Sequence, residues 1–175
     1  MHLYAHGECR TNSQNAIAAV AVRHQLKKGP FRMRTRTYTD SPTDLTDKQI
    51  PKPTQMRAEL AAISLGLDYA LRQISSVHSE EQTQVVIHSD SAAVVHRILS
   101  WTVDWPISGS ISVEGEEWDR LDLISEIVDS VQGLKEFGLV DFRIIDKLRN
   151  WYVIARCDVM LNRLEEGIRH RQQQL

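Results

Sequence analysis

Period-two alternation of polar and apolar residues predicts strands over the first part of the chain. Residues 2–9 and Ala16–Gln25 predict two strands joined by a polar turn. Phe31–Thr39 predicts a third, exposed strand, because arginines alternate there with Met33 and threonines. Residues 40–53 are polar and contain three prolines, which predicts a loop rather than a domain boundary.

Helical spacing of apolar residues begins after this loop. Thr54 is a plausible N-cap for a helix that runs to about Gln73. Further elements are predicted at Gln84–His88 (buried strand), Ser91–Trp101 (helix), Glu117–Leu134 (helix), Val140–Ile145 (strand) and Ala155–Arg169 (helix). The order β-β-β-α-β-α-α-β-α predicts an α/β protein with a mixed five-stranded sheet flanked by helices.

Size and composition favour one globular unit, and we expect a single domain over residues 1–175. A net charge of -2 provides no general attraction to nucleic acid, so any such binding requires a local basic patch. Cys9 and Cys157 lack a metal-ligand spacing and are expected to be reduced thiols. We expect neither a signal peptide nor a membrane span, and therefore a soluble intracellular protein of the cytoplasm or nucleus.

Three acidic residues stand at informative places in these elements. Glu59 lies in the first turns of a helix, Asp90 follows a buried strand, and Asp158 lies near the start of the last predicted helix. Carboxylates that converge from separate elements are how proteins hold hard divalent cations such as Mg²⁺. Each of these acids alone would be read as a helix-start or capping residue.

The segments around these acids resemble the ribonuclease H type 1 family over nearly the full chain. The resemblance rests on T-x-x-R-A-E-L-A-A at 54–62, H-S-D-S at 88–91, R-C-D at 156–158 and the opening Leu3-Tyr4-Ala5-His6-Gly7. It implies an RNase H-like fold and cleavage of RNA in RNA–DNA hybrids with Mg²⁺ or Mn²⁺. By this resemblance, Glu59, Asp90 and Asp158 correspond to three of four metal-binding acids.

The position of the fourth acid holds His6. A neutral imidazole carries no charge and prefers softer ions than Mg²⁺, so metal binding should weaken sharply. We expect His6 to be a site residue hydrogen-bonded to Asp90 or Glu59. Glu8 lies two residues further along the strand, on the same face, and is a candidate replacement ligand.

Other departures from the family pattern point the same way. No histidine lies between residues 97 and 169, where the family carries one on a loop before the last acid. Gln55 and Met56 replace the family's hybrid-contacting asparagines, and of that set only Asn12 is retained. Lys27, Lys28, Arg32, Arg34 and Arg36 form the one concentrated basic patch, which could track phosphates or protect an exposed edge strand.

Three interpretations remain open. The leading one is a degenerate RNase H-like domain, inactive as a nuclease, that serves as a binding or scaffolding module for nucleic acid or a protein partner. The second is an active ribonuclease H that uses Mg²⁺ or Mn²⁺ and tolerates His6. The third is a crevice in which His6, Glu8, Glu59, Asp90 and Asp158 perform other acid–base or metal chemistry on a small molecule.

Overall fold

The computed structural model describes the chain except for residues 12–15, 27–28, 40–51, 77–81, 105–120 and 174–175. Its strands are β1 (His2–Thr11), β2 (Ala16–Gln25), β3 (Arg32–Thr39), β4 (Thr83–Ser89) and β5 (Gly138–Ile144). Its helices are α1 (Gln55–Ser75), α2 (Ala92–Asp104), α3 (Leu121–Lys135) and α4 (Lys147–Gln172). The element order is therefore the predicted one.

The five strands form one mixed sheet in the order β3-β2-β1-β4-β5. The β1–β2 and β2–β3 pairs are antiparallel, whereas β4 runs parallel to both β1 and β5. The first three strands are hairpin-connected, and the later strands need helical crossovers to pair in parallel. The predicted α/β architecture with a mixed five-stranded sheet is confirmed.

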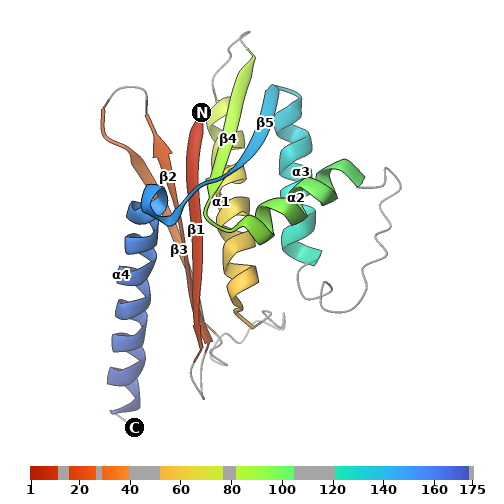
Figure 1. Cartoon of the computed structure of the whole chain (residues 1–175). Helices are drawn as coiled ribbons and strands as arrows, with labels where there is room; N and C mark the ends of the chain where they lie inside the picture. Colours follow the sequence, from red (N-terminus) through yellow and green to blue (C-terminus); the bar gives the residue numbers. More distant parts are fainter. Residues whose placement is uncertain (12–15, 27–28, 40–51, 77–81, 105–120, 174–175) are drawn as a thin grey trace.

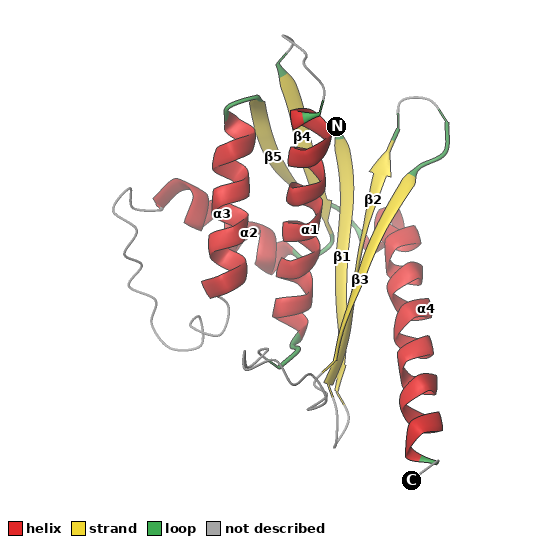
Figure 2. Cartoon of the chain, turned by 180° about the vertical axis from the view of Figure 1, so that it is seen from behind, coloured by secondary structure: helices red, strands yellow, loops and turns green. Residues whose placement is uncertain are grey.

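Helices cover the two faces of the sheet unequally (Figures 1 and 2). One face carries α1, with α2 and α3 beside it, and this layer holds the larger hydrophobic cluster, which includes Leu60, Ile63 and Leu67 of α1. Of the described helices, α4 alone lies on the other face, where it packs on β1 and β2 through Val153, Cys157 and Leu161. No helix among the described residues covers the part of this second face beyond α4 (Figure 1).

Most element boundaries agree with the sequence within three residues. The Thr54 side chain accepts a hydrogen bond from the Arg57 backbone N–H at 3.2 Å, so the predicted N-cap is confirmed. Cys9 and Cys157 are free thiols, as expected. No described helix is both long and apolar enough to cross a membrane. Asn12, Lys27, Lys28 and nearly all of the predicted 40–53 loop lie outside the described residues.

The start of the last helix is the main correction. The sequence predicts a start at Ala155, but α4 begins at Lys147, with Asp146 as its N-cap. The Asp146 side chain accepts a hydrogen bond from the Arg149 backbone N–H at 2.9 Å. Asn150 is therefore the first buried residue of α4, and Asp158 lies well inside the helix rather than near its start.

Candidate functional site

Strand β1 carries the candidate site and approaches α1 very closely. Gly7 makes this approach possible, because a Cβ atom at this position would lie 1.9 Å from the Ala58 carbonyl oxygen. His6 and Glu8 flank Gly7 and point to the opposite face of β1, the one that α4 covers. The glycine therefore brings the first turns of α1, which carry Glu59, up to the strand that carries His6.

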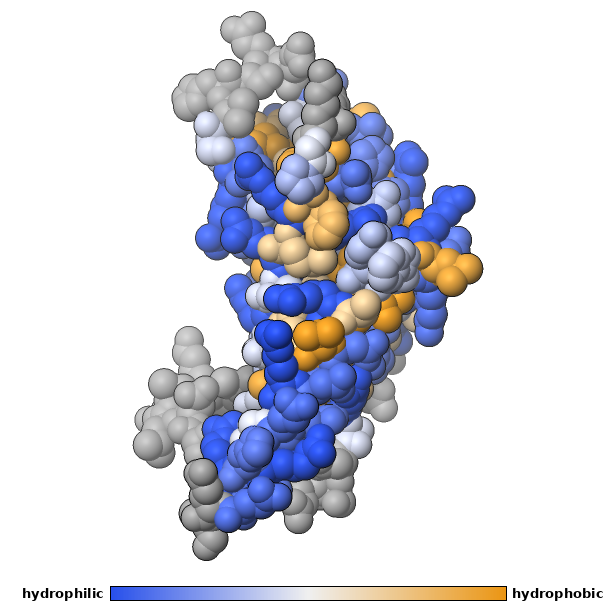
Figure 3. All heavy atoms as spheres, turned by 90° about the vertical axis from the view of Figure 1, so that its left-hand side faces the viewer, coloured by the Kyte–Doolittle hydropathy of each residue, from blue (hydrophilic) through white to orange (hydrophobic). Residues whose placement is uncertain are grey.

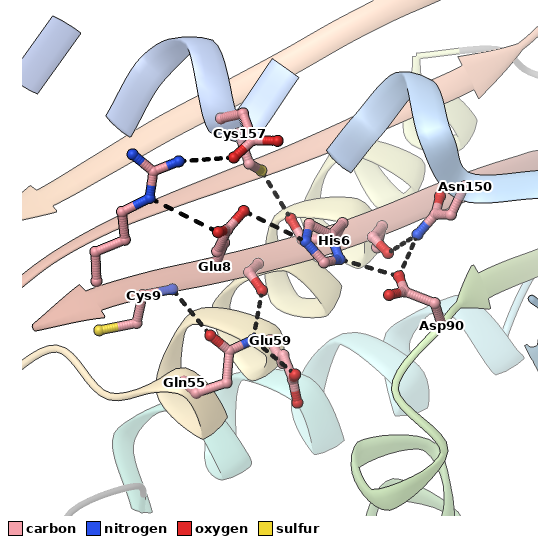
Figure 4. A network of polar contacts seen from close by, with 12 residues as sticks. His6, Glu8, Cys9, Gln55, Glu59, Asp90, Asn150 and Cys157 are labelled. Carbon is pink, nitrogen blue, oxygen red and sulfur yellow. Dashed lines mark hydrogen bonds and ion pairs between the residues drawn. The ribbon is translucent and has the colours of Figure 1, made fainter. Parts of the chain in front are cut away.

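Asp90 lies at the end of β4 and is held by two donors (Figure 4). His6 Nδ1 lies 3.0 Å from Asp90 Oδ1, and Asn150 Nδ2 donates to the same oxygen at 2.5 Å. Asn150 also donates to the Ala5 carbonyl oxygen at 3.0 Å and is fully buried. Of the two hydrogen-bond partners expected for His6, Asp90 and Glu59, the structure shows Asp90. We refer to His6, Asp90 and Asn150 as the Asp90 clamp.

The clamp favours the ionised form of Asp90. Burial alone would raise the pKa of this carboxyl group, but the hydrogen bonds from His6 and Asn150 outweigh burial and hold the pKa below its ordinary value. Because an ionised carboxylate only accepts hydrogen bonds, His6 Nδ1 carries the proton in this arrangement. His6 Nε2 is then the nitrogen that faces Glu8, at 4.0 Å from Glu8 Oε2.

Glu59 is held separately, on the α1 side of the site. Its two carboxylate oxygens accept hydrogen bonds from Gln55 Nε2 at 2.8 Å and from the Ser91 hydroxyl at 2.6 Å. The Gln55 amide also donates to the Gly7 carbonyl oxygen and accepts from the Cys9 N–H, both at 2.9 Å. The pairing of β1 with β4 ends at Ala5 and Ser89, and Gln55 bonds to backbone groups of β1 beyond that pair. The Gln55 amide therefore stabilises the fold in this structure.

Glu8 and Asp158 belong to a neighbouring ion-pair group around Arg10. Arg10 NH2 lies 2.7 Å from Asp158 Oδ1, and Arg10 Nε lies 3.8 Å from Glu8 Oε1. Asp158 stands eight residues after Asn150, which separates the two by about 12 Å along the helix axis. Asp158 therefore does not reach the Asp90 clamp, and the expectation that it converges with Asp90 is corrected. Asn150 is the α4 residue that does.

The residues of this site do not fit a pair of divalent cations. Within the described ranges, no group of three or more His, Cys, Asp or Glu side chains is placed to hold a metal ion. Asp90 Oδ1 accepts hydrogen bonds from two protein donors, and each carboxylate oxygen of Glu59 accepts one. The clamp therefore places a histidine N–H and an amide beside Asp90, where Mg²⁺ would need negatively charged oxygens. We therefore derive no metal-dependent step for this chain.

Asn150 is the site residue that sequence reasoning missed. The signal was its position in the buried stripe Asn150, Val153, Cys157 and Leu161, whose spacing of three and four residues is typical of one helix face. A fully buried asparagine in an apolar stripe is costly unless its amide is hydrogen-bonded. A helix that starts at Ala155 excludes Asn150 and Val153 from this stripe, so the predicted start does not reveal it.

The predicted substrate-binding arginines lie on β3, an edge of the sheet. Arg32 donates to Gln73 Oε1 at 3.3 Å, and the Arg34 guanidinium lies 5.5 Å from the Tyr69 ring centroid, so both face α1. Arg32, Arg34 and Arg36 are exposed, and no carboxylate in the described part of the chain pairs with them. The basic edge is therefore structurally available, while its role stays a prediction.

Comparisons with known proteins find similarity in structure but not in sequence. No family model matches the chain, and no curated protein matches it. RNase H1 from the halophilic archaeon Halobacterium salinarum superimposes with a TM-score of 0.56 at 14% identity, covering 93% of this chain and 98% of that one. LC9-RNase H1, a type 1 RNase H with the type 2 active-site motif, gives 0.57 at 22% identity, covering 90% and 70%.

A third similar structure is LC11-RNase H1 in complex with an RNA/DNA hybrid, with a TM-score of 0.54 at 16% identity over 90% of each chain. Similarity of this extent over most of both chains shows that the chain has an RNase H-like fold. The resemblance to the type 1 ribonuclease H structures is therefore confirmed at the level of the fold. Because a fold does not determine a reaction, function must be argued from the site itself.

Proposed function

We propose that this chain is an RNase H-fold domain that binds nucleic acid without hydrolysing it. The Asp90 clamp carries the proposal. His6 and Asn150 donate hydrogen bonds to Asp90 Oδ1, whereas two-metal hydrolysis would need the Asp90 carboxylate as a ligand for cations. His6 and Asn150 also leave the site with less negative charge. At the two positions beside Asp90 where a carboxylate would help to hold cations, β1 carries a histidine and α4 carries an amide.

Binding is supported by the arginines of β3, which pair with no carboxylate among the described residues, and by the fold. LC11-RNase H1, a structural neighbour, forms a complex with an RNA/DNA hybrid. In this chain, Arg32, Arg34 and Arg36 place three positive charges along one edge strand, on the side that faces α1. Lysine and arginine contacts to phosphates supply most sequence-independent affinity for nucleic acids. We therefore assign this edge as the contact with the nucleic-acid backbone.

The cleavage arm of the test uses a 5′-labelled RNA–DNA hybrid in Mg²⁺ and in Mn²⁺. The native chain is expected to leave the RNA intact, and His6→Asp alone is expected to do the same because Asn150 still lacks a charge. The double variant His6→Asp/Asn150→Asp supplies two carboxylates beside Asp90 and is the variant expected to gain metal-dependent cleavage. Asp158→Asn in that double background is the matched control and should not alter the gain.

The binding arm measures fluorescence anisotropy of the same hybrid with the native chain. Arg34→Glu/Arg36→Glu is expected to weaken binding at least tenfold, whereas Arg169→Glu/Arg171→Glu, with the same charge change on α4, should alter it less than twofold. Cleavage by the native chain that disappears in Asp90→Asn would overturn the proposed loss of hydrolysis. Absence of hybrid binding would overturn the proposed binding.

A second candidate function is acid–base chemistry on a small molecule, favoured by the His6–Asp90 pair. An aspartate that orients a histidine through Nδ1 leaves Nε2 able to accept a proton. The nearby Cys157 thiol is no nucleophile partner, because burial raises its pKa to about 12. The test is hydrolysis of activated esters and phosphodiesters by the native chain and by His6→Gln, and equal rates for the two would exclude this function.

A further inference from the structure

Aromatic rings and arginines gather on the sheet face that α4 covers only in part. Arg23 on β2 lies at the centre, with its guanidinium carbon 4.3 Å from the Tyr4 ring centroid, 5.4 Å from Tyr152 and 5.8 Å from Phe31. Tyr152 also stacks on Trp151 with ring centroids 3.7 Å apart. We call this the aromatic–arginine surface, made of Tyr4, Arg23, Phe31, Trp151, Tyr152 and Arg156.

Three of the rings are unusually exposed for residues of their size. Phe31 is 42% exposed, Trp151 52% and Tyr152 43%, although each carries a large apolar area. Figure 3 shows this side of the molecule, where apolar side chains gather over the middle of the face and hydrophilic ones cover most of the remainder. A cluster of exposed rings on one face is typical of a binding surface rather than of scattered surface residues.

The surface contains a pocket of about 340 Å³, a volume suited to a single planar ring system with its substituents. Its walls are Phe31, Met33, Thr35, Tyr152 and Arg156. Phe31 and Tyr152 line it with their ring centroids 5.6 Å apart and their planes tilted by 52°. An apolar, aromatic wall with one guanidinium at the side fits a nucleobase attached to a phosphate.

The charge of the surface is unbalanced. No carboxylate in the described segments pairs with Arg23 or Arg156, and Arg23 Nε is buried without a hydrogen-bond partner. Two other arginines near the start of α4 differ, since Arg149 pairs with Asp146 and Arg143 with Asp141. Unpaired guanidinium groups beside exposed rings select an anionic ligand with flat, stackable groups.

We propose that the aromatic–arginine surface binds single-stranded nucleic acid, with one unstacked base in the pocket and a neighbouring phosphate on Arg156. Stacking on aromatic side chains holds a base without regard to its identity, because every base has a flat π-face. This site goes beyond the proposed function, because it lies on the face of α4, whereas Arg32 and Arg34 of β3 point to the face of α1. A strand held here would pass close to the Asp90 clamp, since Trp151 directly follows Asn150.

The experiment measures fluorescence anisotropy of a labelled twelve-nucleotide RNA with the full chain at low and moderate salt. Trp151→Ala and Arg156→Glu are each expected to raise the Kd at least tenfold. The matched control is Arg169→Glu, which makes the same charge change on the same helix about 20 Å away along its axis. This control is expected to change the Kd less than twofold, and far-UV circular dichroism verifies that all variants fold.

The alternatives are distinguished by the same assay. Equal weakening by Arg156→Glu and Arg169→Glu would mean diffuse electrostatic attraction and would overturn the site. Adenosine monophosphate that competes as strongly as the oligonucleotide would mean a free-nucleotide pocket and would overturn the assignment to a strand. Because Arg34→Glu/Arg36→Glu should leave single-strand binding intact, failure of the site is distinguishable from failure of the β3 contact with the hybrid.

Discussion

Replacing Asn150 by aspartate tests which α4 residue belongs to the site. In the native chain, the Asn150 amide donates to Asp90 Oδ1 at 2.5 Å and to the Ala5 carbonyl oxygen at 3.0 Å, and the residue is fully buried. Asn150→Asp removes both donations and places a second carboxylate against the first. The side chain hardly changes in size, so the effect reports charge and hydrogen bonding rather than packing.

The expected magnitude follows from two contributions. A lost hydrogen bond to a charged group destabilises by about 1.5–3 kcal/mol. Two like charges about 4 Å apart repel by about 4 kcal/mol at an effective dielectric constant near 20. We therefore expect the free energy of unfolding at pH 7 to fall by about 6 kcal/mol, a large fraction of the stability of an ordinary domain.

The pH dependence gives the sign of the effect. In the native chain, the pKa of Asp90 is lowered, so its stabilising contribution is present above the unfolded value and is lost as the pH falls. In Asn150→Asp, the paired carboxyl groups share a proton and the pKa of the pair rises, as for two carboxylates at one site. The destabilisation should therefore be greatest at pH 7 and smaller at pH 5.

Urea unfolding followed by circular dichroism at pH 7 and pH 5 measures both quantities. The control is Asp158→Asn, which removes an exposed ion pair with Arg10 and should change the free energy of unfolding by about 1 kcal/mol or less. Asp158→Asn that destabilises as much as Asn150→Asp would refute the placement of Asn150 in the site. So would an Asn150→Asp variant whose stability does not depend on pH between 5 and 7.

Three further predictions test other features of the fold. Gly7→Ala should lower the free energy of unfolding in urea by about 3 kcal/mol, because the added Cβ would lie 1.9 Å from the Ala58 carbonyl oxygen. An unchanged urea midpoint of unfolding would contradict the close approach of β1 to α1. Burial lowers the pKa of His88 to about 4, so the unfolded chain binds more protons below pH 6.5 and His88 should lower stability by at most about 3 kcal/mol as the pH drops from 6.5 to 4. In urea unfolding, His88→Gln should reduce this slope, and the slope that is left reflects His2 and His24, whose pKa values burial also lowers. Burial raises the pKa of Cys157 to about 12, so a thiol reagent at pH 8 should leave Cys157 unlabelled in the native chain and label it in urea, as peptide mass spectrometry would show.

The sequence by itself determined the sheet and most helices of this protein. Alternation in β1 to β3, the β-branched run of β4 and the helical stripes of α1 to α3 are local patterns, and local patterns define elements and their order. Through the family resemblance at these positions, the sequence also limited the expected partner of His6 to Asp90 or Glu59, and the structure shows Asp90. The resemblance in short segments was sufficient to identify the fold, although overall identity to similar structures is at most 22% in the examples compared.

Tertiary structure decided which residues complete the site. R-C-D at 156–158 looked like the family's last acidic segment, yet the register of α4 on β1 and β2 places Asn150 at Asp90 and leaves Asp158 with Arg10. That register depends on where the helix begins, which Asp146 sets as the N-cap, and on the packing of Val153, Cys157 and Leu161 against the sheet. A sequence lists the acids of a chain, but the rotation and translation of a helix on its sheet determine which of them meet.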